Sequence, residues 1–337
     1  MSKPTSITVV PENWILDDEG DIILAVGPTG AHRITVSSKV LCLASDVFKA
    51  MTKPRFREGL SLRSPKNPTA EPVVIVLPDD DPLATLMLCQ LLHFQIDMVE
   101  SHPDAMKVLA LAVVCDKYNC AGAIRYATEM WLNLLVGSAD VSSLKQLLIA
   151  TYLLDSAVMF ASVTSKLLRD WTGSFKGLAR ELDNTSLPTV IYVALEEKRL
   201  KSLFDVERSL QEMFRDTKTA VCDNGHHLNP TGAIGQCVTI FVQVGIWPIS
   251  PTPSIAVTLK QLNAFKWTPF SKGCGNSRCP IDFGPKIKEI YDMLRQIGGL
   301  CLDCVHHDGH NPGECRVAHS KGVVNSENGA ILNRRRH

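Results

Sequence analysis

The chain has 337 residues, of which 45% are hydrophobic and 21% are charged. This composition supports a buried core with a solvated surface, and it excludes an intrinsically disordered chain or a collagen-like repeat. Lys and Arg together number 35, as do Asp and Glu, so the formal net charge is zero. A neutral chain is atypical of a dedicated nucleic-acid binder. At about 150 residues per domain, the length predicts two domains.

No targeting segment or membrane span is visible in the sequence. Residues 1–11 lack the apolar core of a signal peptide. The longest uncharged stretch, residues 224–259, is interrupted by Pro, Gly, Asn and Gln. We therefore expect a cytoplasmic or nuclear protein that does not associate with membranes. In such a compartment its 11 Cys residues are expected to be reduced thiols or metal ligands rather than disulfides.

Strand and helix signals alternate at the beginning of the chain. Residues 21–26 are an apolar run next to glycines, and residues 33–36 alternate in hydrophobicity, so both are predicted strands. The Gly-Pro-Thr-Gly sequence at 27–30 predicts a tight turn that joins them into a hairpin. Ser37 is the expected N-cap of a single helix that continues to Met51.

A further strand and three helices are predicted before residue 135. Residues 73–77 form a continuous apolar run, which predicts a buried strand. The sequence Asp79-Asp80-Asp81-Pro82 is typical of a helix N-terminus, because carboxylates favour the positive end of the helix dipole and Pro suits the first turn. Residues 83–93 are the expected helix. Residues 104–135 predict two more helices, with a break at 120–122.

The remainder of the chain changes character twice. Residues 138–216 have apolar residues at helical spacing and are expected to be all-helical, with the charged run 196–199 on a solvated face. After residue 217, Pro and Gly increase, and helical periodicity is evident only near residues 287–297. Residues 260–337 contain 12 Lys and Arg against 7 Asp and Glu, which is a net charge of +5, so this region is basic.

Residues 34–51 resemble the central signature of a BTB/POZ domain, in which a short strand precedes a helix that carries Leu, Ser and Phe at set offsets. Those positions are Leu41, Ser45 and Phe48 here, and Asp21 stands at the head of the preceding strand. Residues 55–59, 73–77, 91–93 and 111–118 continue the match, so that it covers residues 13 to about 130. The pattern is most similar to the BTB proteins that are abundant in filamentous fungi.

The resemblance implies an α+β fold, in which a small sheet is capped by helices, for a BTB/POZ domain at residues 13–135. Residues 138–216 resemble the helical extensions that often follow such domains, and residues 217–337 form a Cys/His-rich C-terminal region. The family implies a protein–protein interaction function, often through self-association as a homodimer. In some members it also implies docking onto a cullin-type ubiquitin ligase.

Three residues form the partner-binding set that the resemblance implies. Phe56-Arg57-Glu58 matches the hydrophobic-any-Glu pattern of cullin-docking members, where an apolar anchor fills a shallow pocket beside a carboxylate. The alternative is that Phe56 covers the core of its own domain and that Glu58 is solvated. Asp21 keeps its family position, although Ser37 stands where many animal members have His.

The sequence carries no motif that is typical of an enzyme. It has no phosphate-binding Gly-rich loop, no Gly-x-Ser-x-Gly and no His-Glu-x-x-His. The acidic run 79–81 is better explained by helix capping than by metal catalysis, because adjacent residues at a helix start point in different directions. Cys115 and Cys120 lack Cys-x-x-Cys spacing and lie in an apolar setting, so both are expected in the core. We therefore predict that the protein is not an enzyme.

The C-terminal region contains a predicted zinc site. Cys301 and Cys304 form a Cys-x-x-Cys knuckle, and Cys315 and His319 follow ten residues later as a Cys-x-x-x-His pair. Together they supply the four ligands of a tetrahedral structural zinc ion. The rival ligands are His306, His307 and His310, and the alternative is a set of exposed reduced thiols.

A second Cys/His set is weaker. It joins Cys222, with His226 or His227, to Cys274 and Cys279 across a long loop. Cys237 lies in an apolar run and is expected in the core.

Two functions from different classes follow. The first is a non-enzymatic adaptor that acts through protein partners. The alternative is a nuclear DNA- or chromatin-associated regulator, which the basic C-terminal region and the run Arg334-Arg335-Arg336 favour. No groove-reading helix is evident, and aromatic residues are not interleaved with Lys and Arg, so nucleic acid is not the expected partner.

Overall fold

The computed structural model of the chain describes residues 12–54, 71–182, 187–218, 230–248, 254–267, 282–306 and 314–319. The chain divides after Met159 into two compact units. Among the described residues, no helix combines the length and the apolar composition needed to cross a lipid bilayer.

The first unit contains a four-stranded mixed sheet. Its strands are β1 (Glu12–Ile15), β2 (Ile22–Val26), β3 (His32–Val36) and β4 (Val73–Leu77), in the order β1-β3-β2-β4. β2 and β3 are antiparallel, whereas β1 pairs with β3 and β4 pairs with β2 in parallel. The turn between β2 and β3 places Gly27 and Gly30 at φ values of 85° and 63°, a region that favours glycine. The predicted hairpin and the strand at 73–77 are confirmed.

The single helix predicted from Ser37 to Met51 is wrong, because the segment forms α1 (Ser38–Ala44) and α2 (Asp46–Met51). Ser45 between them is extended, and its hydroxyl accepts a hydrogen bond from the Phe48 amide at 3.1 Å and donates one to the Tyr118 carbonyl at 2.5 Å. A serine with these two bonds favours a new N-cap over a continued helix. The predicted cap is also wrong, since the Ser37 side chain makes no capping bond.

Among the described residues of the first unit, four further α-helices and one short 3₁₀ helix follow. They are α4 (Pro82–Leu92), η1 (Ile96–Met98), α5 (Ala105–Tyr118), α6 (Arg125–Ser138) and α7 (Val141–Leu153), and α5 packs against both α4 and α7. Asp81 caps α4 as predicted, by accepting a bond from the Ala84 amide at 2.8 Å. Asn119, at a φ of 49°, ends α5 and confirms the predicted break.

Asp80, the middle residue of the acidic run, has a different role from its neighbour. Its carboxylate is buried and pairs with the Lys117 ammonium and the Tyr118 hydroxyl at the end of α5. The Tyr118 ring in turn stacks on Phe48, with ring centroids 4.3 Å apart. Burial, and then the nearby Asp80 carboxylate, raise the pKa of Tyr118, so that its hydroxyl remains a donor. This network connects α2, α4 and α5 through a fully partnered polar core.

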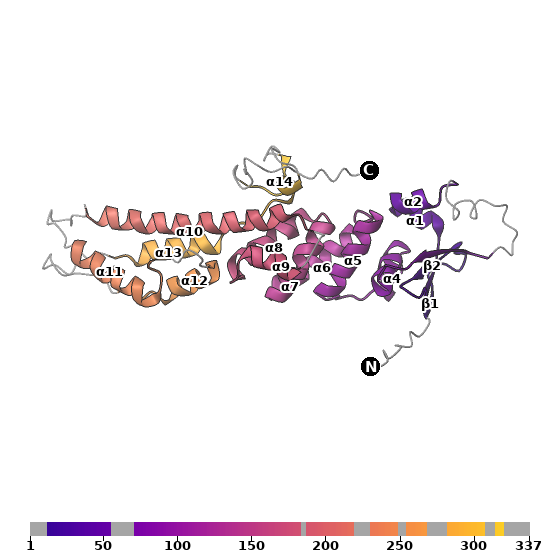
Figure 1. Ribbon diagram of the computed structural model, residues 1–337, viewed down its shortest axis with the longest axis horizontal. Coiled ribbons are helices and arrows are strands. Elements are labelled where there is room, and N and C mark those ends of the chain that lie inside the picture. The colour runs from indigo at the N-terminus through magenta and orange to yellow at the C-terminus, as the bar shows by residue number, and fades with distance from the viewer. Residues whose placement is uncertain are drawn as a thin grey trace, which may run out of the picture. The chain divides into compact units, whose positions relative to one another are not determined.

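The second unit is helical. Its elements are α8 (Ala157–Asp170), which begins two residues before the boundary, α9 (Phe175–Leu182), α10 (Thr189–Lys218), α11 (Pro230–Val244), α12 (Ile255–Ala264), α13 (Gly284–Arg295) and α14 (Leu302–His306). The all-helical prediction for residues 138–216 is confirmed by the described residues. α11 and α13 pack against α10, and α12 packs against both of them (Figure 1).

The prediction that helical periodicity after residue 217 is confined to residues 287–297 is wrong. In α11, Ala233, Cys237 and Phe241 follow a four-residue spacing and are fully buried. The Phe241 ring lies 6.0 Å from Phe214 of α10 and 5.0 Å from Phe265, which follows α12. Aromatic rings contributed from distant segments therefore stabilise helices whose own sequences carry weak periodicity.

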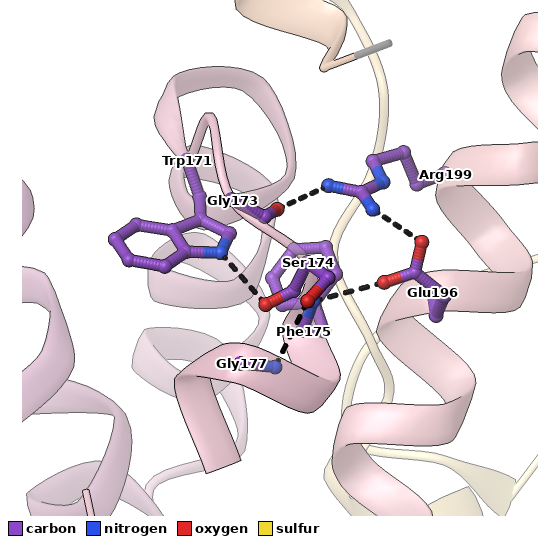
Figure 2. Close-up of polar contacts among 7 residues, drawn as sticks. All are labelled: Trp171, Gly173, Ser174, Phe175, Gly177, Glu196 and Arg199. Atoms are coloured by element: carbon purple, nitrogen blue, oxygen red, sulfur yellow. Dashed lines mark hydrogen bonds and ion pairs between the residues drawn. The ribbon is translucent and has the colours of Figure 1, made fainter. Parts of the chain in front are cut away.

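The charged run 196–199 is not a fully solvated face as predicted. Figure 2 shows Arg199 with its guanidinium between the Gly173 carbonyl and the Glu196 carboxylate. The bond to Gly173 is 2.6 Å, and the other carboxylate oxygen of Glu196 accepts a 2.9 Å bond from the Phe175 amide. Arg199 is 5% exposed and joins α10 to the start of α9. Arg199 and Glu196 therefore connect two helices through a largely buried ion pair, whereas Glu197 is exposed.

Candidate metal centre

The four predicted zinc ligands lie together in the structure. The ligand atoms of Cys301, Cys304, Cys315 and His319 are all within 4.8 Å of one another. The Cys304 sulfur is 3.6 Å from the Cys315 sulfur and 3.3 Å from Nε2 of His319, and the latter is 3.2 Å from the Cys315 sulfur. His306, one of the rival ligands, lies in α14 and is not part of this group. His307 and His310 lie outside the described residues.

The separations among Cys304, Cys315 and His319 are close to the dimensions of a tetrahedral zinc site. Zinc–sulfur bonds of ~2.3 Å at tetrahedral angles place two sulfurs ~3.8 Å apart, and a sulfur and an imidazole nitrogen ~3.6 Å apart. The observed distances are within a few tenths of an ångström of these values. Three thiols and one imidazole are also the donor types that zinc prefers. The group can therefore hold a metal ion.

Cys301 and Cys304 form the first half of the centre, and the segment that precedes them is anchored on α8 and α10. The Leu300 amide donates to the Thr164 hydroxyl at 2.8 Å, and the Lys198 ammonium donates to the Gly299 carbonyl at 2.7 Å. A Cβ atom at Gly299 would lie 1.8 Å from the Ala161 carbonyl oxygen, so only glycine permits this approach. Cys301 follows directly and is 3% exposed. The helices thus fix the position of the first ligand.

Protonation of the thiols sets a condition on metal binding. Burial, and then the neighbouring Cys315 and Cys301 thiols, raise the pKa of Cys304 to about 12 in the metal-free chain. Burial also raises the pKa of Cys315. Zinc binds thiolates, so a bound ion must displace protons from these sulfurs.

Sequence reasoning did not identify the residues that support the ligands. Gly299 carries no motif, and Lys198 was assigned to a solvated run. Asp303 and Arg316 stand beside the ligands in the sequence, and their mutual contact depends on the folded chain. The only available signal was their position, since Asp303 lies between two ligands and Arg316 follows a third.

Asp21 is the only residue of the predicted partner-binding set that lies within the described residues. Its carboxylate is half-buried and accepts bonds from the Ser38 amide and hydroxyl, both at 2.8 Å. The Ser37 amide donates to Nε2 of His93 at 3.0 Å. Asp21 therefore holds the start of α1 within its own chain, as an anion at a helix N-terminus does.

Several predicted residues lie outside the described part of the chain. These are Phe56 and Glu58 of the docking triplet, Cys222, His226, Cys274 and Cys279 of the second Cys/His set, and the run Arg334-Arg335-Arg336. Docking onto a cullin, the second metal site and contact with DNA stay predictions.

No protein-family model matches the chain, and no curated protein matches it.

Proposed function

We propose that this chain is a non-enzymatic interaction protein, in which a BTB/POZ-type first unit mediates self-association and a structural zinc ion orders part of the second unit. The observation that carries the interaction function is the uneven exposure of large hydrophobic side chains. Of the 20 such exposed side chains among the described residues, 14 lie before Phe160 and 6 lie after it. Exposed apolar side chains concentrated in one unit are the kind of surface that a protein-binding region uses.

The strand order of the first unit supports the BTB/POZ resemblance. The hairpin of β2 and β3 leads into α1 and α2, and the chain then returns as β4 beside β2. Leu41 and Phe48, two of the signature residues, are 0% and 1% exposed, as core positions should be. Ser45, the third, caps α2. The three positions therefore have physical roles that depend on their residue types.

The chemistry of the ligands supports zinc as the metal. Soft thiolate donors with one imidazole suit zinc, whereas hard cations such as Mg²⁺ and Ca²⁺ require oxygen ligands. Four protein ligands leave no position for a substrate or water, which is typical of a structural rather than a catalytic zinc site. We therefore assign the metal no role in a reaction.

Self-association is tested on the full chain by light scattering. Leu43 in α1 is 90% exposed, so its replacement leaves the core intact. We expect the wild type to be a dimer at about 50 μM, and Leu43→Asp to be a monomer, because a charge in an apolar interface is left unpaired. The matched control is Phe204→Asp, at a residue of α10 that is 64% exposed in the second unit. A monomeric wild type at this concentration would contradict the proposed assembly.

A further inference from the structure

The metal centre is assembled from two chain segments that are separated in the sequence. Cys301 and Cys304 form the first half, and Cys315 and His319 form the second. The first half is fixed to α8 and α10 through the bonds to Leu300 and Gly299. The second half must be placed against it with its sulfur and nitrogen at metal-binding separation.

One carboxylate connects the two halves. Asp303 lies between the two ligands of the first half, and Arg316 directly follows Cys315. The Arg316 amide donates to Oδ2 of Asp303 at 2.7 Å, and its Nε donates to Oδ1 at 2.8 Å. A terminal guanidinium nitrogen of Arg316 is 2.6 Å from the same Oδ1. The Asp303 side chain is 14% exposed, so water screens this contact only partly.

The three contacts restrict the second half in complementary ways. The bond to the Arg316 amide fixes the backbone immediately after Cys315. It thereby restricts the direction in which the Cys315 side chain points. The planar guanidinium adds a second, directional attachment that an ammonium group cannot reproduce. Because both attachments meet on one carboxylate, they place Cys315 relative to Cys301 and Cys304 without any metal.

We propose that Asp303 and Arg316 are the positioning pair of the metal centre, which holds the two ligand pairs at binding separation before the ion arrives. This inference rests on the proposed structural zinc site. Residues that support metal ligands in this way usually change metal affinity 10- to 100-fold when they are replaced. The loss arises because the ion must then order the second half as it binds.

The test measures zinc affinity of the full chain by competition with a chromophoric chelator. Asp303→Asn keeps the size of the side chain but removes its charge. Arg316→Lys keeps the charge but removes the planar guanidinium group. We expect about 10- to 100-fold weaker zinc binding for Asp303→Asn and a smaller loss for Arg316→Lys. The control is Lys286→Ala, which removes an exposed ion pair with Glu289 at 2.9 Å outside the centre and should leave zinc affinity unchanged.

Replacement of zinc by Co²⁺ distinguishes weaker binding by a correctly formed site from loss of the site itself. The variants should retain the absorption of tetrahedral Co²⁺ at saturating metal while they bind it more weakly. The double variant Asp303→Asn, Arg316→Lys should lose little more affinity than Asp303→Asn alone, because the two residues act through one contact. Additive losses, or wild-type affinity in Asp303→Asn, would overturn the positioning pair while leaving the zinc site in place. A wild type that binds no zinc would overturn the zinc site itself.

Discussion

The core cysteines and the candidate ligand cysteines differ in burial and in their surroundings. Cys89 and Cys115 in the first unit and Cys237 in the second are buried among apolar side chains. Burial, and then the nearby Cys120, raise the pKa of Cys89 to about 12, and burial alone does the same for Cys237. Cys304 of the metal centre has its pKa raised to the same level. A raised pKa therefore does not distinguish a core cysteine from a candidate ligand. Burial separates them only in part, because Cys301 is buried whereas Cys304 and Cys315 are half-buried.

A ligand cysteine differs from a core cysteine because other ligand atoms converge on it and because polar groups surround it. Around Cys304, two further sulfurs and an imidazole lie within metal-binding distance, and the neighbouring residue Asp303 is held by Arg316. Cys120 instead contacts the Cys115 carbonyl, with its sulfur 3.7 Å from that oxygen. A thiol of this kind behaves as a small hydrophobic side chain.

Each of the two regions also contains a carboxylate that is held by a cationic side chain. Asp80 pairs with Lys117 within a core that includes the stacked rings of Phe48 and Tyr118. Asp303 pairs with Arg316 in a segment whose fully buried apolar residues are few, with Leu300 and Leu302 the clearest. The first unit is therefore expected to be stable without metal, whereas the segment around the centre, in which the Asp303–Arg316 contact restricts the ligands, gains further order from a bound ion.

Loss of the metal ligands should have the largest effect. In Cys301→Ser, Cys304→Ser, two of four donors are removed, and structural zinc in such sites contributes ~10–16 kcal/mol of binding free energy. We expect native mass spectrometry to show one zinc per wild-type chain and none in the variant. A chelator should make residues 298–320 sensitive to protease while the first unit stays intact.

Equal metal content in wild type and variant would contradict the assignment. Unchanged protection of residues 298–320 in the presence of chelator would show instead that a bound ion adds no order beyond that of the side-chain contacts. The matched control is Cys115→Ser, which changes a thiol in the first unit and should leave one zinc per chain.

The anchoring of the centre on α8 should give the next largest effect. In Gly299→Ala, the added methyl would lie 1.8 Å from the Ala161 carbonyl oxygen, so the segment must move away from α8. We expect a loss of about 3 kcal/mol in the free energy of unfolding, measured by urea denaturation, as for a severe steric overlap. Gly298→Ala is the control, because its nearest atom, Nζ of Lys198, would be 4.0 Å away. Similar stabilities for the two variants would contradict the close approach.

The sequence predicted the elements and ligands that depend on local signals. The turn at Gly27 and Gly30, the cap at Asp81 and the spacing of Cys301 and Cys304 are each encoded within a few residues, and the structure contains all of them. The break at Ser45 was missed because its hydroxyl is held by the Tyr118 carbonyl, which is 73 residues away.

The supporting residues of the centre were missed for the same reason. Gly299 is restricted by Ala161, and Lys198 by the Gly299 carbonyl, and both partners are distant in sequence. The helix α11 was missed because its buried face contains small residues such as Ala233 and Cys237. Its Phe241 ring packs against Phe214 of α10, a contact that a periodicity argument does not include. Local chemistry was predictable, whereas contacts between distant segments required the folded chain.

The polar core of the first unit should give a moderate effect. Ser45→Ala removes both the bond that caps α2 and the bond to the Tyr118 carbonyl. Loss of an N-cap costs about 1–2 kcal/mol in the free energy of unfolding, and we expect this loss in thermal denaturation. Ser37→Ala is the matched control, because Ser37 occupies the cap position of α1 without a side-chain bond and its replacement should be neutral. Equal losses in both variants would show that the hydrogen bonds of Ser45 make no specific contribution to the free energy of unfolding.

The smallest expected effect is that of replacing a core cysteine. Cys89 in α4 is 1% exposed, and Cys89→Ala removes one buried sulfur, which we expect to cost about 1 kcal/mol through the small cavity left behind. Zinc content should remain one per chain, because Cys89 is not among the convergent ligands. Cys304→Ala removes a single sulfur likewise, yet it should lower zinc affinity by at least about 100-fold, because a ligand is lost. Inductively coupled plasma mass spectrometry and urea denaturation of both variants separate the two kinds of cysteine. If Cys89→Ala lost zinc as Cys304→Ala does, metal binding would depend on the first unit, and the division between core thiols and ligand thiols would be wrong.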